Sequence, residues 1–262
     1  MADEEDKKKK SYYTVGAVDK MCDLIEALSE RDAWDLAELV KRMQMPKTSV
    51  HRFLLTLADR GYVVQEKRRG RYSLSFKLFS IASRVVEQTS LLKISRPFAE
   101  KLRDTLGETV NVTVPSGTDM LVVDKCLSAN ALRQDVQLGT LFTMTESASG
   151  RIYLAFASDE DRHRVLTLAQ TEADPSVYQK IQAVIERKEE IAERAIEVDD
   201  EEQFAGIRCL SAAILDSSNQ ACASISVSVP VTRDSDDFRR RAGEALLTAA
   251  RQISKRLGAA VF

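Results

Sequence analysis

The chain has 262 residues, of which 44% are hydrophobic and 30% are charged, and its formal net charge at pH 7 is -2. This length and hydrophobic content allow two packed cores, so we expect two domains. No apolar run approaches the roughly 18 residues of a membrane span, and the charged opening MADEEDKKKK lacks the apolar stretch of a secretion signal, which predicts a cytoplasmic protein without a membrane partner.

Residues that bind metals are few and far apart. The chain has four cysteines and two histidines, and no two cysteines form a CxxC pair. This spacing is typical of reduced, mostly buried thiols and leaves few ligands for a metal ion. We therefore expect neither a metal nor another cofactor. These residues are Cys22, Cys126, Cys209, Cys222, His51 and His163.

The first folded part is predicted to contain three helices. Residues 1–13 are charged and low in complexity, which is typical of a disordered tail. Apolar residues at three- and four-residue intervals from Val15 onward predict a helix with one buried face. Asp35 offers an N-cap to a second helix, and a third helix begins near Pro46 and ends at Gly61.

A hairpin is expected to follow these helices. Tyr62–Gln65 and Tyr72–Leu74 indicate two short strands around the polar loop KRRGR, in which Gly70 is expected to take a positive φ angle. The order helix, helix, turn, helix, hairpin is that of a winged helix-turn-helix. We predict such a domain over residues 14–75.

Basic residues are concentrated in this part of the chain. From Lys41 to Tyr72 there are nine basic and two acidic residues, an excess that favours a polyanionic partner. A helix that reads the major groove needs polar and cationic side chains near its N-terminus, and the segment PKTSVHRFLLTL provides them. An ordinary capped surface helix would show the same pattern, but the arginines of the hairpin loop favour double-stranded DNA. The predicted DNA-binding residues are Lys47, Thr48, Ser49, His51, Arg52, Arg68, Arg69 and Arg71.

Beyond the hairpin the pattern changes. Residues 76–92 have helical periodicity and predict a linker helix, and a second helical run covers Leu91–Leu106. Residues 93–262 combine strands with amphipathic helices, which predicts an α+β sandwich with a mostly antiparallel sheet. The expected strands are Thr109–Val114, Leu121–Lys125, Leu132–Leu138, Ile207–Leu215 and Ala221–Val229, and the expected helices are Ser149–Ala157, Asp159–Leu168, Pro175–Ala195 and Asp234–Leu257.

The last of these strands has a polar and an apolar face. Ser224, Ser226 and Ser228 alternate with branched apolar residues, and alternate residues of a strand point to opposite sides. The serines can face solvent, or they can line a pocket for a small polar molecule. Small residues before the strand and Pro230 after it favour a central strand, and therefore a pocket.

The segment ESASG at the start of an expected helix offers a second polar feature. Ser147, Ala148, Ser149 and Gly150 are small, and the free backbone N–H groups of a helix start favour an anion such as a carboxylate. Ordinary capping by Ser147 or Ser149 is the alternative interpretation.

Both halves of the chain resemble the IclR family of transcription regulators. In the first half the resemblance runs through VDKMCDLIEALSE, LAELVKRMQMPKTSVHRFLLTLADRGYV and YSLSFKLFSIA, and in the second through LGTLFTMTESASGRIYLAF, DDEEQFAGIRCLSAAILD and ASISVSVP. It spans about Val15 to Leu257 and departs at Arg151, where the family frequently has lysine. The resemblance implies an α+β fold: an N-terminal winged helix-turn-helix, a helical linker and a GAF-like effector-binding domain with an antiparallel sheet.

The resemblance also implies a function and site residues. The chain would be a homodimer or homotetramer that represses a catabolic operon until a small organic acid, or a related lactone or aldehyde, releases it. The backbone of Ala148 and Ser149 would hold the acid group, and Asp199 would take a hydroxyl or carbonyl-side proton. A plain core thiol at Cys209 and a solvated acid at Asp199 are the alternatives. The implied ligand-binding residues are Phe142, Ala148, Ser149, Asp199, Ile207, Cys209, Ser226 and Ser228.

Two other functions stay open from the residues alone. A hydrolase-like enzyme with an accessory DNA-binding domain would need a nucleophile motif such as GxSxG and a well-placed histidine. His51 belongs to the predicted DNA helix, and His163 lies in the charged segment DEDRHR. A DNA-architectural protein without a ligand would leave the large second domain unexplained. We therefore expect a regulator and not an enzyme.

Overall fold

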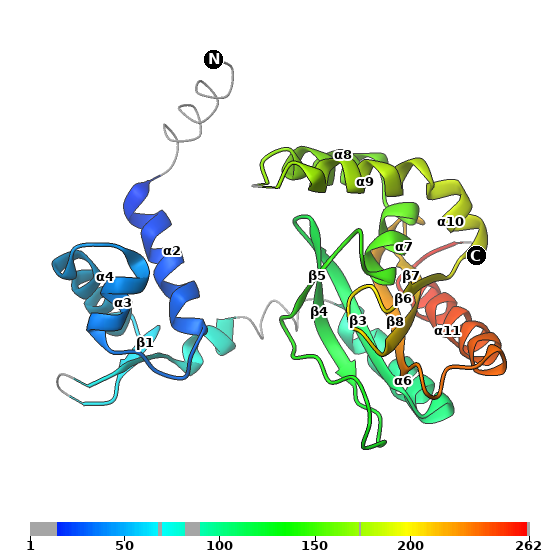
Figure 1. Cartoon of the computed structure of the whole chain (residues 1–262), viewed down its shortest axis with the longest axis horizontal. Helices are drawn as coiled ribbons and strands as arrows, with labels where there is room; N and C mark the ends of the chain where they lie inside the picture. The colour runs from blue at the N-terminus through cyan, green and yellow to red at the C-terminus, as the bar shows by residue number, and fades with distance from the viewer. Residues whose placement is uncertain (1–14, 68–69, 82–89, 173, 261–262) are drawn as a thin grey trace, which may run out of the picture. The chain divides into compact units, whose positions relative to one another are not determined.

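The computed structural model of the chain describes residues 15–67, 70–81, 90–172 and 174–260. The chain folds into two compact units, residues 1–88 and residues 89–262 (Figure 1). The predicted tail, residues 1–13, lies outside the described residues. Of the predicted linker, residues 76–81 are helical, and residues 82–89 lie outside the described part of the chain.

The first unit is a winged helix-turn-helix, as the sequence predicts. Asp35 caps the second helix in a capping box, in which the backbone N–H of Asp35 donates to the carboxylate of Glu38 at 3.2 Å. Gly61 ends the third helix with a φ of +77°, a value that glycine adopts without strain. The elements are α2 (Gly16–Ser29), α3 (Leu36–Met43), α4 (Lys47–Asp59), β1 (Val63–Gln65) and β2 (Tyr72–Leu74).

A small apolar core joins these elements. One face of each helix and the inner side of the hairpin bury their side chains together, and a single bridge between Trp34 and Tyr72 ties the segment before α3 to β2. The positive φ expected at Gly70 stays a prediction, because this angle also involves Arg69, which lies outside the described residues. Glycine is needed there for a further reason: a Cβ would lie 2.9 Å from the backbone of Lys67. The fully buried core residues are Leu24, Leu28, Trp34, Leu39, Val50, Leu54, Leu57, Val63 and Tyr72.

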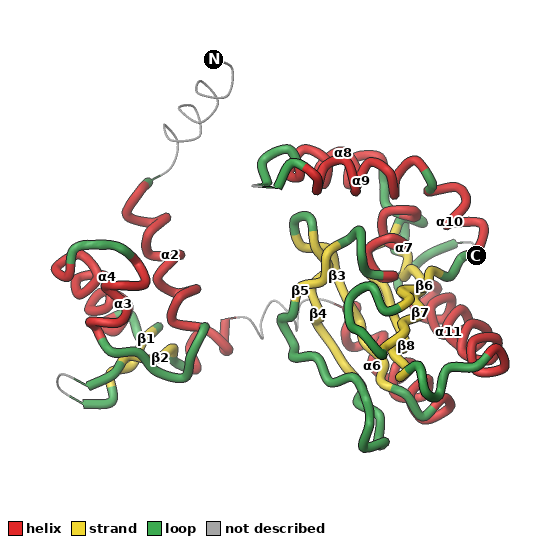
Figure 2. Tube along the Cα trace, in the orientation of Figure 1, coloured by secondary structure: helices red, strands yellow, loops and turns green. Residues whose placement is uncertain are grey.

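The second unit is built on a six-stranded antiparallel sheet with the order β5-β4-β3-β8-β7-β6 (Figure 2). β8 is therefore central, between β3 and β7, which confirms the expectation for the serine strand. The strands are β3 (Thr109–Ser116), β4 (Asp119–Cys126), β5 (Leu141–Thr143), β6 (Glu197–Asp200), β7 (Ile207–Leu215) and β8 (Ala221–Pro230). The helices are α6 (Ser90–Leu106), α7 (Ala148–Phe156), α8 (Asp159–Ala169), α9 (Ser176–Glu186), α10 (Lys188–Arg194) and α11 (Asp236–Arg256).

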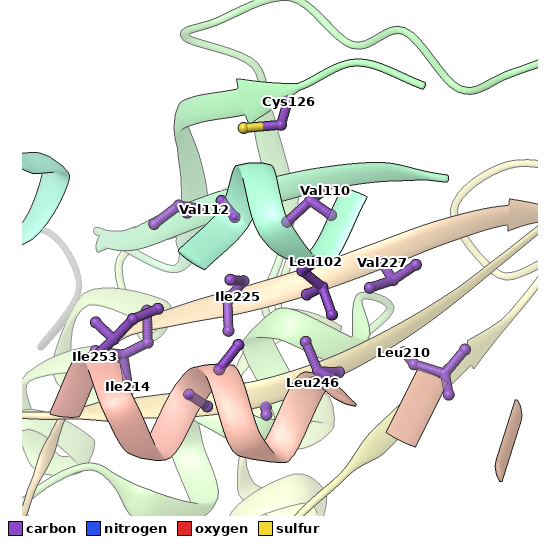
Figure 3. Packing of buried hydrophobic residues seen from close by; sticks show 14 of the residues in the cluster. Leu102, Val110, Val112, Cys126, Leu210, Ile214, Ile225, Val227, Leu246 and Ile253 are labelled. Carbon is purple, nitrogen blue, oxygen red and sulfur yellow. The ribbon is translucent and has the colours of Figure 1, made fainter. Parts of the chain in front are cut away.

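The two faces of the sheet are covered differently. On the apolar face, α6 and α11 pack on the branched residues of β3, β7 and β8, so that Ile225 and Val227 lie near Leu102 and Leu246 (Figure 3). On the other face α7 packs against β7 and β8, and α10 packs against α7. Burial of apolar area on both faces drives folding of this unit, because a second apolar cluster packs between the sheet and α7. The polar residues of the strands lie on this second face, called the polar face below.

Three expectations for this unit are corrected. Residues 132–138 form no strand, and β5 pairs with the edge of β4 instead. Two carbonyl oxygens of this segment, those of Gln134 and Val136, accept from the side chains of Thr109 and Lys125. β6 was not expected. The single helix expected over 175–195 is two helices, which are interrupted at Arg187, where φ is -99° and ψ is 12°.

Candidate functional site

The exposed side of α4 carries the residues that the sequence predicts for DNA. Lys47, Thr48, His51 and Arg52 are exposed and Ser49 is half-buried. Val50, Leu54 and Leu57 on the opposite side of the helix are buried in the core of the first unit. The N-terminal turns of α4 therefore present hydrogen-bonding and cationic groups to solvent on a rigid support, as a helix that enters the major groove does.

The hairpin adds a further cation. Arg71 pairs with Glu66 at 3.2 Å, and both side chains are about half exposed. An exposed ion pair of this kind contributes roughly 0.2–1 kcal/mol, so a phosphate can replace the carboxylate at little cost. Arg68 and Arg69 lie outside the described residues.

A small cavity lined mostly by polar residues lies in the second unit, on the polar face of the sheet. Its volume is about 20 Å³, roughly the space of one water molecule. An edge-to-face contact between Phe142 and Phe204, with ring centroids 6.0 Å apart, lies at the cavity. The lining residues are Asn111, Gln134, Phe142, Ser147, Ala148, Ser149, Asp199, Gln203, Phe204, Cys209, Ser226 and Ser228.

A wider hollow of about 400 Å³ on the other side of the sheet has a different character. It lies between α6 and α11, with apolar residues at its floor and exposed groups such as Lys101 and Glu244 at its rim. These groups are open to water and need no ligand. We assign the site to the small cavity, because its polar groups are buried.

The register of the sheet places the cavity residues side by side. Asp199 of β6 is paired with Cys209 of β7, and Cys209 is paired with Ser228 of β8. Ser226 of β8 is paired with Asn111 of β3. Directly opposed residues in an antiparallel ladder project to the same face, so strands far apart in the sequence form one polar floor.

The N-terminus of α7 supplies the other wall. The Ser147 hydroxyl caps the helix by accepting from the N–H of Gly150 at 3.1 Å, which confirms the capping interpretation of the ESASG segment, and the anion site stays a prediction. Within the described chain, the N–H groups of Ala148 and Ser149 have no acceptor, as expected for the first turn. Gly150 allows this arrangement, since a Cβ there would lie 2.2 Å from the backbone of Met144.

Two ionisable groups in the cavity are affected by burial. Burial raises the pKa of Asp199, and the N–H groups of Glu202 and Gln203, which donate to Asp199 Oδ1, oppose this shift. Burial also raises the pKa of the Cys209 thiol to about 12, so the thiol is neutral at physiological pH. Its Sγ lies 3.2 Å from the Ser228 hydroxyl.

Arg151 ties the two sides of the cavity together. From α7 its guanidinium donates to Glu197 Oε1 at 2.9 Å, to the carbonyl of Val198 at 2.7 Å and to the carboxylate of Glu202. A fourth bond reaches the carbonyl of Thr145 at 2.9 Å. The start of α7 is thereby fixed to β6 and to the loop that follows it.

The cavity contains seven of the eight ligand-binding residues expected from the sequence. Ile207, although described, does not line it, and its role stays a prediction. Five further residues line the cavity and were not predicted as ligand-binding residues: Asn111, Gln134, Ser147, Gln203 and Phe204. The alternation VNVTV carried a signal for Asn111, since the residues between the valines are polar, whereas Gln134 lies in a segment without regular structure and had no signal.

The described residues give no sign of a metal or membrane site. Among them, no three His, Cys, Asp or Glu residues are grouped so that they could hold a metal ion. No helix within the described ranges has both the length and the apolar character needed to cross a bilayer. The candidate site therefore consists of the exposed face of α4 and the cavity at α7.

These features define a class. A winged helix-turn-helix with a cationic α4, followed by a separate unit that encloses a polar cavity, is the arrangement of a DNA-binding transcription regulator with an effector domain. Comparison with known protein families identifies the family to which the chain belongs. Residues 17–67 match the IclR helix-turn-helix domain, and residues 83–255 match the bacterial transcriptional regulator IclR C-terminal domain. The chain belongs to the IclR family of bacterial transcription regulators, whose members are not enzymes.

Individual relatives agree with this assignment over nearly their whole length. The transcriptional repressor IclR of Escherichia coli is 28% identical over 228 residues, which is 85% of this chain and 82% of the relative. The regulator KdgR of Escherichia coli is 27% identical over 246 residues, 94% of each chain. Among solved structures, the IclR protein of Thermotoga maritima has a TM-score of 0.72 at 21% identity and covers 94% of this chain and all of its own. This last similarity shows the shared fold.

Proposed function

We propose that the chain is a repressor whose hold on operator DNA is released when a small organic acid, or a related lactone or aldehyde, enters the cavity at α7. The observation that carries the proposal is the buried polar cavity beside two unpartnered backbone N–H groups, those of Ala148 and Ser149. Such groups at a helix start, together with the helix dipole, favour an anion. Two of the relatives are named repressors, IclR and AllR of Escherichia coli, which favours repression over activation.

In this proposal each of the two units has its own role. Residues 14–75 would bind DNA, residues 76–92 would link the units, and residues 93–262 would bind the effector. The backbone of Ala148 and Ser149 would hold the carboxylate, with the polar floor of the sheet opposite. Phe142, Cys209, Ser226 and Ser228 would complete the contacts, and Asp199 would accept a hydrogen bond.

The proposed DNA contacts belong to α4 and the hairpin. Lys47, Thr48, Ser49, His51 and Arg52 would read bases and phosphates in the major groove, and Arg68, Arg69 and Arg71 would contact the backbone. A ligand changes DNA affinity only if it binds two arrangements of the protein unequally. The effector would therefore favour the arrangement in which the two DNA-binding domains of a dimer no longer match two half-sites.

The salt dependence of DNA binding tests the hairpin contacts. The double variant Arg68→Ala/Arg69→Ala should weaken binding to every duplex, because it removes phosphate contacts and not base contacts. The slope of log affinity against log salt concentration should fall by about 0.9 per lost contact. Fluorescence anisotropy with a labelled duplex that the protein selects from promoter fragments gives this slope.

The matched control is Arg164→Ala/Arg187→Ala, two exposed cations of the second unit. It should leave the slope unchanged. An unchanged slope in the hairpin variant would show that Arg68 and Arg69 do not contact the DNA phosphates. If the wild-type protein prefers no promoter fragment over random duplex, the proposed function itself fails.

A further inference from the structure

Two buried carbonyl oxygens line the cavity without a hydrogen-bond donor. They are Oδ1 of Asn111, a residue that is 2% exposed, and Oε1 of Gln134, which is 8% exposed. Within the described part of the chain only four buried side-chain polar atoms lack a partner, and two of them meet in this one small cavity. Buried acceptors are nearly always paired in folded proteins, so two orphans in one place call for an external donor.

The fold holds both side chains in place. Asn111 stands in β3 opposite Ser226, and its Nδ2 donates to the hydroxyl of Ser228 at 3.4 Å. Gln134 is held through its main chain, whose carbonyl accepts from Thr109 Oγ1 at 2.9 Å. The Asn111 side chain is therefore fixed by its own hydrogen bond, and the main chain of Gln134 is fixed beside the cavity, where its side chain is 8% exposed.

The chemistry of the missing partner follows from the two amides. A carbonyl oxygen accepts hydrogen bonds, so the partner must donate. Since the Ser228 hydroxyl both donates and accepts, turning the Asn111 amide over would exchange an orphaned acceptor for an orphaned donor. In the turned arrangement one hydroxyl group pairs with both amides, because it accepts from Asn111 Nδ2 and donates to Gln134 Oε1, whereas a keto oxygen can only accept and leaves the Gln134 oxygen unpaired.

We propose that Asn111 and Gln134 form a hydroxyl-binding wall of the cavity and restrict the effector to small hydroxy acids. The carboxylate lies on the N–H groups of Ala148 and Ser149, and the hydroxyl accepts from the turned Asn111 amide nitrogen and donates its one proton to the Gln134 oxygen. This assignment rests on the proposed function of the cavity as the effector site. The cavity volume, about 20 Å³, is that of about one water molecule, so we test the smallest acids, of two to four carbons, and their entry requires lining side chains such as Phe204 to shift.

Calorimetric titration of the full chain with matched acids tests the assignment. Glycolate, lactate, glycerate and 3-hydroxybutyrate carry a hydroxyl, and acetate, propionate, butyrate and pyruvate are their counterparts without it. We expect at least one hydroxy acid to bind about tenfold or more tightly than its counterpart, because a site built to bind a hydroxyl is left with unpaired groups by an analogue that lacks it.

Two variants then locate the preference. Gln134→Met and Asn111→Leu keep the shape of each side chain and remove its polar atoms, so each should bring the two acids of a pair to nearly equal affinity. Because the Gln134 oxygen is unpaired in the free protein, Gln134→Met should not lower the melting temperature without ligand, whereas Asn111→Leu also loses the bond to Ser228. Gln182→Met, an exposed glutamine of α9, is the control and should keep the preference. If Asn111→Leu melts early, Asn111→Val replaces it.

The outcomes separate the two proposals. If acids bind and alter DNA affinity but the hydroxyl makes no difference, the hydroxyl-binding wall is wrong and the effector site stands. The same follows if Gln134→Met and the folded Asn111 variant keep the preference. If none of the eight acids binds, both the wall and the acid site at α7 are wrong.

Discussion

Burial of Asp199 in the cavity disfavours the charged form of its carboxyl group. Its side chain is 3% exposed, and burial raises its pKa against the opposing effect of two N–H donors. A raised carboxyl pKa means that the folded state binds the proton more tightly than the unfolded state does. The stabilising effect of the proton is complete below the ordinary pKa of an aspartate, and it is lost as the pH rises through the higher pKa of the folded protein.

The variant Asp199→Asn should remove this pH dependence. Asparagine offers the same Oδ1 to the N–H groups of Glu202 and Gln203 and never becomes charged. Its melting temperature, compared with that of the wild type, should rise as the pH increases from 4 to 7, by about 2–4 °C for each kcal/mol of penalty removed. Thermal unfolding at a series of pH values measures the difference. The exposed control Glu193→Gln should show no such trend, and a constant difference for Asp199→Asn would contradict the argument.

Among the elements, α7 has the most demanding position. Its first turn must expose N–H groups to the cavity and at the same time pack closely on the backbone of Met144, which only Gly150 allows. Arg151, the next residue, anchors the helix to β6 and the following loop through three hydrogen bonds and donates a fourth to the carbonyl of Thr145, before the helix. Lysine has three donors on one nitrogen and cannot reach four acceptors arranged around a planar guanidinium.

The variant Arg151→Lys should therefore loosen the loop after β6 while the charge is kept. We expect a loss of about 1–3 kcal/mol in the free energy of unfolding, because the buried carbonyls lose their donors. Hydrogen exchange followed by mass spectrometry should show faster exchange in residues 199–206 and unchanged exchange in β8. Arg164→Lys, an exposed arginine that pairs only with Asp161 on its own helix, should change neither. Equal exchange in residues 199–206 would show that Arg151 does not hold the loop.

At the scale of the whole chain, the sequence predicted those elements that show local periodicity or capping signals. Segments and site residues whose positions depend on tertiary contacts could not be predicted. Alternation along β8 and the capping signal at Asp35 are local, so the serine face and α3 were predictable. The path of residues 132–138 depends on side chains of Thr109 and Lys125, which lie far away in the sequence. For the same reason Gln134 could not be placed at the cavity, and Arg151 could not be identified as its anchor.

At the same scale, the helical segment of residues 76–81 carries an exposed apolar surface. Phe76 is 90% exposed and Phe79 is 71% exposed, while Lys77 between them fixes the segment by donating to the carbonyl of Arg60 at 2.5 Å and lying 4.5 Å from the ring of Tyr62. Two exposed phenylalanines on a fixed helical segment form an apolar patch that favours burial against a second chain. We expect this patch to hold the proposed dimer together.

The double variant Phe76→Ser/Phe79→Ser should therefore shift the chain from dimer or tetramer toward monomer, as measured by light scattering coupled to size exclusion. DNA affinity should fall as well, because a monomer contacts one half-site and loses the gain of binding two at once. Leu132→Ser/Leu138→Ser changes two other exposed apolar residues, in the second unit, and should alter neither mass nor affinity. If the Phe76 and Phe79 variant keeps the mass of the wild type, another surface holds the subunits together. If it becomes monomeric but binds the operator as before, the protein does not need two half-sites.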